Sequence, residues 1–543
     1  MVPSSFHRWL AVALVAAIGL LGSGCVGAEP SDRSSTPNNA QSRGLVEASI
    51  AEAVSLHPYK TSDTASFKYW GLVYGGTLVE RVPQDPSQFR GNFAESWTVS
   101  DDQTTYTFKL RPDLVWSDGQ PMTATDFKWT YDQASNPANA WPYISNLENI
   151  ASYEAPDEHT IVVKLKEPVA VGLEMADAIT ALPKHIWEKL DWNDPSTNPE
   201  YNKPTVGSGP FLLQDWQRDN QAVFVPNDRY FRGRPKLDSY TIRIAGNATV
   251  GYQWLKTGEV DRFTFLPSDY EDAKRQPNLT VYEWWPASGD WSYIGFNLRR
   301  PLVQDVRVRQ ALAYAVDRNL IIDKVLYGLA QPIYSAFGPT CWCYNPDVPH
   351  RDYDLAKARE MLDEAGWSPG ADGIRQKDGQ RLKLRLMFGP NTNRVREQIA
   401  TITQDSFKQI GVDLEIQTLE WSAYLSALRT PPFDWDMNVG GWSATVDPYW
   451  MYQIWSEDNI PELNAGAYKN PELEALFKKG ARTFDQAERK QIYGEIQRIL
   501  TDDQPYIYLY MNKGWDGVNN RIGGIEPTTL GIDYNIEQWY VKQ

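Results

Sequence analysis

Tryptophan is the residue type whose chemistry stands out in this chain, which has 22 Trp among its 543 residues. An indole face packs against the apolar C–H face of a sugar ring, and the indole N–H donates a hydrogen bond to a hydroxyl. Tryptophan is equally a large core residue with one polar atom, and we expect most of the 22 to be core residues. The excess therefore fits both a sugar-binding cleft and an aromatic core.

Several common motifs of catalytic and metal sites are absent from the sequence. The chain has no HExxH, CxxC or Walker motif, which excludes the common metal hydrolases and nucleotide enzymes. Two carboxylates could serve a glycoside hydrolase, but 69 acidic residues make such a pair easy to imagine and uninformative. We therefore expect no catalytic residue, no metal and no cofactor. The five histidines are scattered at His7, His57, His159, His185 and His350.

Two cysteines, Cys341 and Cys343, are separated by a single residue. A disulfide between them is chemically permitted outside the cytoplasm, although it would close a small ring. Two packed free thiols are the alternative. A CxC metal site would need a cluster of His or carboxylate ligands, which does not accompany this pair.

The N-terminal residues resemble an export signal. A positively charged start is followed by an apolar run that is short for a membrane span, so we predict a signal peptide over residues 1–24. The sequence before Cys25 resembles a lipobox, except that Gly22 occupies the usual Leu position, and we expect Cys25 to be lipidated; an ordinary cleaved signal is the alternative. Residues 25–44 have the composition of a flexible tether, with a reach on the order of 25 Å.

The length and net charge of the chain limit the number of domains and the kinds of binding partner that it can have. A chain of 543 residues is too long for one hydrophobic core, so two or three domains are expected. The hydrophobic content of 42% and charged content of 22% are ordinary for a folded protein. A net charge of -16 argues against nucleic acid and anionic membrane surfaces as partners.

Periodicity predicts alternating strands and helices. Residues 104–110 alternate as a half-buried strand, Asp118-Gly119 is a turn, and Thr123 with Asp126 forms a capping-box helix start. Asp354 is a predicted N-cap, and Gly366 can end that helix in a left-handed conformation. Further strands are predicted at 160–165, 222–225, 239–244, 292–297, 382–387, 412–416 and 506–510, with a helix carrying Val395, Ile399, Ile402 and Ile410.

Five segments in order resemble the family 5 extracellular solute-binding proteins, receptors that deliver oligopeptides, oligosaccharides or nickel chelates to ABC importers. The matching segments are Thr105 to Tyr131, Gly207 to Phe211, Asp305 to Arg318, Tyr353 to Trp367, and Gly441-Trp442 with Asp447-Pro448.

The resemblance implies an α/β, two-lobed, periplasmic-binding-protein-like fold of the large three-subdomain class, with mixed sheets and flanking helices. We expect the first lobe to comprise residues 45–78, 205–297 and 506–543, with residues 79–204 inserted as a subdomain, and the second lobe to comprise residues 298–505. Two crossings between lobes make a hinge and a cleft, where ligands are commonly held.

The family places several aromatic segments along this cleft. By resemblance, Trp442, Trp421, Tyr424, Trp291 and Gly441 are the candidate ligand-binding residues. The indole faces of the three tryptophans could stack on a sugar ring.

Position 445 bears on the ligand class. In peptide-binding branches of the family, an Asp three residues beyond the Gly-Trp tryptophan pairs with the α-ammonium of the ligand, and here that position is Thr445. A buried ammonium without an opposite charge is strongly penalised, so a peptide receptor needs an anion nearby. Asp447 could take the role, but we favour the interpretation that it caps the helix after Pro448.

We therefore predict a monomeric, lipid-anchored receptor outside the cytoplasm, which binds an oligosaccharide and presents it to an ABC permease. The alternative is the same role with an oligopeptide ligand, and a secreted glycoside hydrolase is a remote third interpretation.

Overall fold

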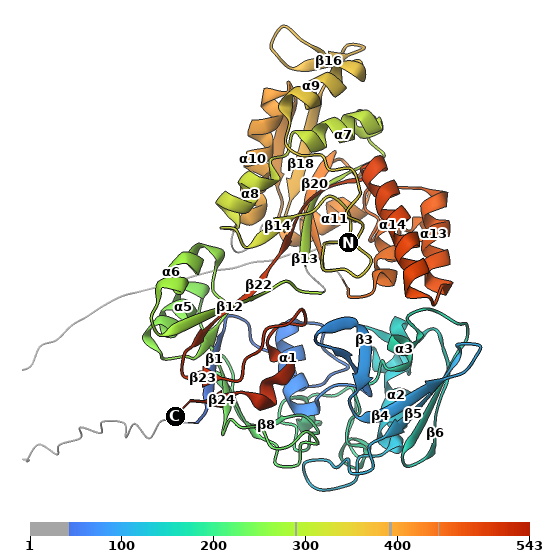
Figure 1. The fold of residues 1–543 in the computed structure, drawn as a ribbon, viewed down its shortest axis with the longest axis vertical. Coiled ribbons are helices and arrows are strands. Elements are labelled where there is room, and N and C mark those ends of the chain that lie inside the picture. The colour runs from blue at the N-terminus through green and yellow to red at the C-terminus, as the bar shows by residue number, and fades with distance from the viewer. Residues whose placement is uncertain (1–42, 288–289, 390–393, 444, 543) are drawn as a thin grey trace, which may run out of the picture. The chain divides into compact units, whose positions relative to one another are not determined.

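Two mixed β-sheets carry the fold, and the chain crosses between them twice (Figure 1). The computed structural model describes residues 43–287, 290–389, 394–443 and 445–542, which all belong to one compact unit. The predicted signal segment, Cys25 and all but the last two residues of the predicted tether lie outside the described residues. Within the described residues, no helix combines the length and apolar character needed to cross a membrane.

The first sheet has seven strands in the order β12-β22-β11-β1-β10-β9-β8. Strand β1 (Leu45–Ser49) lies in its middle, parallel to both neighbours, and helix α1 (Thr64–Tyr74) follows it along the chain. The strands predicted at 222–225 and 239–244 are confirmed as β9 and β10. The other elements are β8 (Phe211–Gln217), β9 (Gln221–Pro226), β10 (Tyr240–Ile244), α5 (Ala248–Thr257), β11 (Arg262–Phe263), α6 (Tyr270–Arg275), β12 (Leu279–Trp284) and β22 (Gly514–Asn519).

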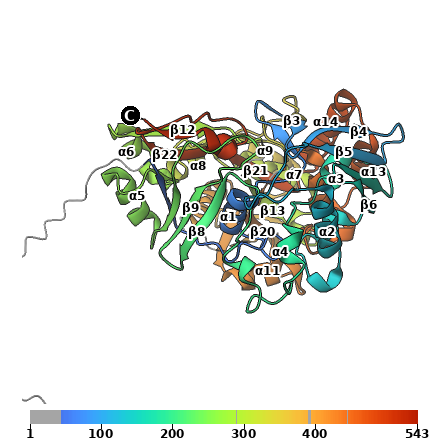
Figure 2. The same cartoon turned by 90° about the horizontal axis from the view of Figure 1, so that it is seen from below.

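A four-stranded sheet, β4-β5-β7-β6, lies between α1 and β8 in the sequence, and helices α2 and α3 lie beside it (Figure 2). Asp126 accepts a hydrogen bond from the Thr123 amide at 2.8 Å, which confirms the predicted start of α2. The elements of this region are β2 (Val79–Val82), β3 (Asp85–Gly91), β4 (Ala94–Val99), β5 (Thr105–Leu110), α2 (Ala124–Ala134), β6 (Ile150–Asp157), β7 (Thr160–Leu165), α3 (Gly172–Ala176) and α4 (Lys184–Trp187).

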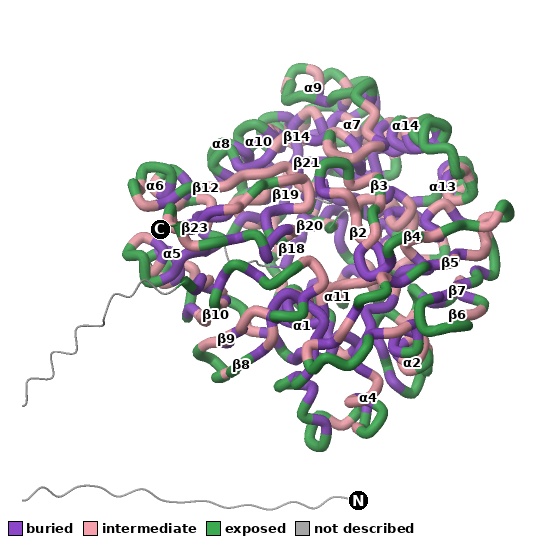
Figure 3. Tube along the Cα trace, turned by 60° about the horizontal axis from the view of Figure 1, so that its bottom comes forward, coloured by how far each residue is buried: buried purple, intermediate pink, exposed green. Residues whose placement is uncertain are grey.

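The second large sheet has six strands in the order β14-β21-β13-β20-β18-β19. Asp354 caps α9 by accepting from the Ala356 and Lys357 amides, as predicted. Five of the ten residues of α9 are exposed and two are buried, so this helix lies at the outer surface (Figure 3). The elements are β13 (Asp290–Phe296), α7 (Val306–Tyr314), α8 (Arg318–Val325), β14 (Ala330–Pro332), α9 (Leu355–Glu364), β18 (Lys383–Phe388), α10 (Val395–Gln409), β19 (Asp413–Thr418), α11 (Trp421–Arg429), β20 (Met437–Ser443), α12 (Tyr452–Trp455), α13 (Pro471–Arg482), α14 (Gln486–Asp503) and β21 (Tyr506–Asn512).

Two strands lie in a different sheet from the one that we predicted. Strand β13, assigned from sequence to the first lobe, pairs with β20 and β21 in the six-stranded sheet. Strand β21 was expected to carry the chain back to the first lobe, but β22 does so one strand later. The first six residues of β21 are all buried, so its continuous apolar run marks a central strand without indicating which sheet it joins.

Cys341 and Cys343 form a disulfide, which decides between the alternatives left open by the sequence. Trp342, held between them, lies edge-on to Tyr493. The Arg489 guanidinium lies 5.1 Å from the centre of the Trp342 ring.

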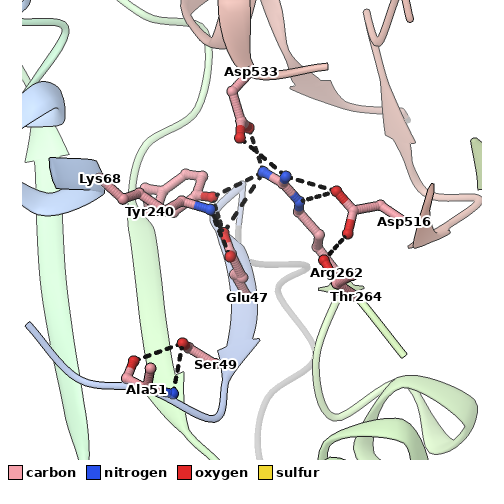
Figure 4. Close-up of polar contacts among 9 residues, drawn as sticks. All are labelled: Glu47, Ser49, Ala51, Lys68, Tyr240, Arg262, Thr264, Asp516 and Asp533. Carbon is pink, nitrogen blue, oxygen red and sulfur yellow. Dashed lines mark hydrogen bonds and ion pairs between the residues drawn. The ribbon is translucent and has the colours of Figure 1, made fainter. Parts of the chain in front are cut away.

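A buried ion network ties the C-terminal segment to the seven-stranded sheet (Figure 4). Arg262, only 5% exposed, donates to Asp516 at 2.7 Å and to Asp533 at 3.0 Å. Glu47 lies 3.7 Å from the same guanidinium, and Lys68 pairs with Glu47. One arginine therefore connects strands β1, β11 and β22 to the short helix η8 (Asp533–Gln538).

His57 lies in an aromatic box beside the four-stranded region. Its ring centre is 4.7 Å from the ring centres of Trp187, Trp192 and Tyr201, and its Nδ1 accepts from the Tyr59 amide at 3.2 Å. Burial, reinforced by the charge of Lys60, lowers the pKa of His57 to about 3. The imidazole is therefore neutral in the folded protein at neutral pH.

This histidine should make the protein sensitive to mild acid. The unfolded chain takes up a proton near the ordinary histidine pKa of about 6.5, whereas the folded chain does so only near pH 3, so stability falls as the pH drops through this interval. Between pH 7 and pH 5 we expect His57 to account for about 2 kcal/mol of lost unfolding free energy. Urea denaturation at both pH values measures the loss, which should be smaller by that amount in His57→Gln. The exposed His159→Gln is the control, and equal losses in all three proteins would contradict the prediction.

Candidate functional site

The end of strand β20 is where the candidate residues meet. It pairs with β13 so that Trp442 lies opposite Trp291 and Ser443 opposite Asp290. A Cβ atom at Gly440 would lie 2.5 Å from the ring of Tyr293, so glycine lets this ring lie directly across the strand.

An aromatic pocket of about 240 Å³, which we call the tyrosine pocket, opens beside β20. The ring of Tyr293 stacks on that of Tyr506, with ring centres 4.0 Å apart. It also stacks on Trp442, with ring centres 6.4 Å apart. Burial raises the pKa of Tyr506 to about 12, so its hydroxyl stays neutral. The pocket is lined by Tyr293, Tyr506, Trp421, Tyr424, Trp442, Arg396, Asn438, Gly441 and Glu462, among others.

A second pocket of about 330 Å³, the edge pocket, lies at the end of the same strands. It is more polar than the tyrosine pocket, and its polar side chains include Asp290, Arg396, Ser292 and Asn512. Its lining residues are Asp290, Trp291, Ser292, Val395, Arg396, Gly440, Gly441, Trp442, Ser443, Tyr510 and Asn512.

Arg396 contributes to both pockets from the first turn of α10. Its Nη1 donates to the Gly389 carbonyl at 3.1 Å, and its guanidinium lies 5.0 Å from the centre of the Trp421 ring. A guanidinium presents a planar fork of donors that suits carboxylates and carbonyl oxygens. This side chain can therefore bind an anionic or strongly polar group in either pocket.

The structure brings most of the predicted residues to these pockets. Trp442 and Gly441 line both, whereas Trp421 and Tyr424 line only the tyrosine pocket. Trp421 is 44% exposed, but Tyr424 is buried, and its hydroxyl donates to the Val439 carbonyl at 3.1 Å.

Trp291 has a mainly structural environment. It lines only the edge pocket and is 3% exposed, because it packs against Tyr293, Tyr506 and Tyr508 in the core.

Thr445 and Asp447 do not line either pocket. The Thr445 hydroxyl donates to the Asp447 carbonyl at 2.7 Å. Asp447 caps the short helix η6 (Pro448–Met451) by accepting from the Tyr449 amide at 2.9 Å, which confirms the capping interpretation.

Both carboxylate oxygens of Asp447 also accept from Arg489, each at 2.8 Å, and the two side chains are buried together. Burial alone would lower the pKa of Arg489, but the hydrogen bonds and charge of Asp447 leave it raised. The Asp447 carboxylate is therefore already committed to a cation of the protein.

Several lining residues were not predicted from the sequence. Arg396 and Asp290 sit in no motif, and only the pairing of β13 with β20 and the packing of α10 bring them to Trp442. Tyr506 could have been noticed as the first residue of the predicted strand at 506–510. Among the described residues there is no cluster of His, Cys, Asp and Glu suited to a metal ion.

Comparison with known proteins gives a consistent result. The family model described as bacterial extracellular solute-binding proteins, family 5 Middle, matches residues 88–461. The oligopeptide-binding protein AppA of Bacillus subtilis is 31% identical over 542 residues, covering 98% of each chain.

Solved structures agree with the sequence match. The structure of AppA from Bacillus subtilis in complex with a nonapeptide has a TM-score of 0.74 and 30% identity, covering 92% of this chain and all of that one. NikZ from Campylobacter jejuni in complex with Ni(L-His) has a TM-score of 0.75 and 25% identity, covering 92% of this chain and 99% of that one. The predicted α/β, two-lobed binding-protein fold is confirmed. This chain belongs to the bacterial extracellular solute-binding proteins of family 5.

Proposed function

We propose that this protein is the oligopeptide-binding receptor of an ABC importer. The observation that carries the proposal is Arg396, which lines both pockets beside Trp442. A peptide offers a carboxylate and a row of carbonyl oxygens to a guanidinium, whereas a neutral oligosaccharide offers neither. The similarity to AppA supports the same ligand class.

The comparisons favour the peptide alternative over the oligosaccharide that we first preferred. That preference rested on the excess of Trp and on the neutral residue Thr445. Nine tryptophans of the described ranges are buried, including Trp116, Trp187 and Trp455, so a large part of the Trp excess belongs to cores. A hydrolase role has no support from membership in a family of binding proteins.

We further propose that the two large sheets are the cores of two lobes that close over the ligand. The crossings lie between β12 and β13 and between β21 and β22, and Trp284 pairs with Gly514 beside them. Two contacts away from these crossings connect the region of the four-stranded sheet to α13. The Ala170 amide donates to the Ala481 carbonyl at 2.7 Å, and Arg482 pairs with Glu167 at 2.9 Å. A ligand would favour closure through contacts that exist only in the closed form.

Attachment to a membrane through lipidated Cys25 remains our proposal from the sequence. Mass spectrometry of the mature N-terminus and fractionation of a Cys25→Ser variant test it. Release of the variant from membranes that retain the wild type would support the anchor, and identical fractionation would contradict it.

A thermal-shift screen of the mature protein tests the ligand class. Peptides of three to nine residues should raise the unfolding midpoint by mass action, and neutral oligosaccharides should not. Loss of the stacking face in Trp442→Ala should weaken peptide binding about tenfold. Trp254→Ala, in α5 and away from both pockets, is the matched control. A shift with sugars alone would overturn the proposal.

A further inference from the structure

A pocket of about 530 Å³, which we call the C-terminal pocket, lies between helix α1, the paired strands β2 and β3, and the C-terminal segment. Figure 1 shows the C-terminal segment, in red, beside α1. The pocket shares no lining residue with the tyrosine pocket or the edge pocket, so it is separate from the candidate peptide site. Its volume is within the range of small-molecule sites, roughly 300–1,000 Å³.

Two polar side chains in the wall of this pocket are buried without a partner. Glu537, on the short helix η8, is 8% exposed, and Tyr230 is 7% exposed. Within the described part of the chain, neither the Glu537 carboxylate nor the Tyr230 hydroxyl makes a hydrogen bond or an ion pair. Neither group is fully enclosed by protein atoms, so both can be reached from the pocket. An unpaired carboxylate in such a place is unfavourable, and a cation beside it would offset the penalty.

The other charged side chains in the wall already have partners. Arg232 is an example, because its guanidinium lies 2.7 Å from the Glu80 carboxylate and donates to the Asn92 side chain at 2.7 Å. The ion pairs of the remaining charged wall residues are Arg90–Glu80, Arg81–Glu174, Lys68–Glu47 and Asp533–Arg262. Among the described residues of the wall, Glu537 is therefore the one charged group that is not paired with an opposite charge.

The chemistry of the wall favours a positively charged organic ligand. A primary ammonium donates three hydrogen bonds, and a carboxylate and a phenol hydroxyl both accept them. Burial raises the pKa of Tyr230, so its hydroxyl stays neutral and does not add a second negative charge. An anion would be repelled by Glu537. The carbon body of the ligand would contact the apolar part of the wall, which includes Phe67, Leu72, Pro83, Pro210, Leu530 and Ile536.

We propose that the C-terminal pocket is a second ligand site, which binds a small organic ammonium ion through Glu537 and Tyr230. This inference goes beyond the proposed peptide-binding function and does not depend on it. Helix η8 carries both Glu537 and Asp533, and Asp533 pairs with Arg262 in the buried ion network. A bound ammonium ion therefore connects η8 to Tyr230, in the segment after β9, and stabilises the attachment of the C-terminal segment.

Calorimetric titration of the mature protein with n-butylammonium and phenethylammonium chloride tests the proposal. Each amine should bind saturably at one site per chain. Uncharged n-butanol should bind at least about tenfold more weakly, because it cannot form the charged hydrogen bond. Hydrogen exchange locates the site, since n-butylammonium should slow exchange in residues 530–538, which contain η8, and leave β20 unchanged.

Three substitutions separate the groups involved. Glu537→Gln keeps the shape of the side chain but not its charge, and it should weaken n-butylammonium binding about tenfold or more. Tyr230→Phe removes only the hydroxyl and should weaken binding about threefold, and it provides the test if Glu537→Gln does not fold. Glu271→Gln is the matched control, because Glu271 is exposed on α6 and lines none of the three pockets. Its binding should stay within about twofold of the wild type.

Several results would overturn the inference. One is the absence of saturable binding of either amine. Another is equal binding of n-butylammonium and n-butanol, which would mean that the pocket takes apolar molecules without regard to charge. Unchanged affinity in both Glu537→Gln and Tyr230→Phe would mean that the amine binds elsewhere. Slower exchange in β20 rather than in residues 530–538 would assign the amine to the peptide site, which also contradicts the proposal.

Discussion

Replacing Arg489 with methionine is expected to lower the unfolding free energy by about 3–5 kcal/mol, because the change leaves the buried Asp447 carboxylate without its cation. Arg489 also donates to the Gly480 carbonyl at 3.1 Å, so one side chain connects α13, α14 and the segment after β20. Urea denaturation followed by tryptophan fluorescence measures the loss.

The same helix offers a matched control. Arg498 pairs with Glu495 and Asp502 on the exposed face of α14, and solvent screens such pairs. Arg498→Met should therefore cost less than about 1 kcal/mol. Asp447→Leu combined with Arg489→Met should recover much of the loss, because both charges are then absent. Similar losses in the two single Arg variants would refute the assignment of Arg489 as a buried structural cation.

Arg262→Met should be comparably damaging, with a loss of about 3–5 kcal/mol. Without the guanidinium, Glu47, Asp516 and Asp533 would face one another with Lys68 as the remaining cation of the network drawn in Figure 4. Like charges in a buried site repel strongly. The C-terminal segment should detach first, because Asp533 is its ionic link to the sheet.

Hydrogen exchange resolved by peptide distinguishes this local effect from global loss of stability. Amides in residues 526–541 should exchange faster in Arg262→Met, while those of β20 keep most of their protection. Arg275→Met, which removes an exposed arginine 4.0 Å from Asp272 on α6, is the control and should exchange like the wild type. Uniform acceleration across both sheets would mean that Arg262 does not act chiefly on the C-terminal segment.

Local chemistry in the sequence predicted local structure well. Thr123 and Asp126 predicted the start of α2, and Asp354 predicted the N-cap of α9. Asp447 followed by Pro448 predicted the start of a further helix. Each of these features depends on atoms within a few residues, so the sequence contains the whole interaction.

Long-range pairing limited what could be predicted about the site. The partner of Asp447 is 42 residues away on α14, and Asp290 reaches Trp442 only because β13 pairs with β20. The apolar run of β21 fits the centre of either sheet, so its assignment needed the actual pairing. Family resemblance identified Trp442, Trp421 and Tyr424, but Arg396 had no local pattern that pointed to it.

The position of β22 has a consequence for the order in which the protein folds. This strand comes near the end of the chain, yet it lies between β11 and β12 and contributes Asp516 to the buried network around Arg262. During synthesis, β12 therefore lacks its partner until more than 500 residues have been made. The seven-stranded sheet therefore cannot be completed while the chain emerges. Its unpaired strand edges stay available to other proteins until β22 has been made. A chain built this way suits export before folding, because the step that completes its first sheet waits until β22 (Gly514–Asn519) has been made.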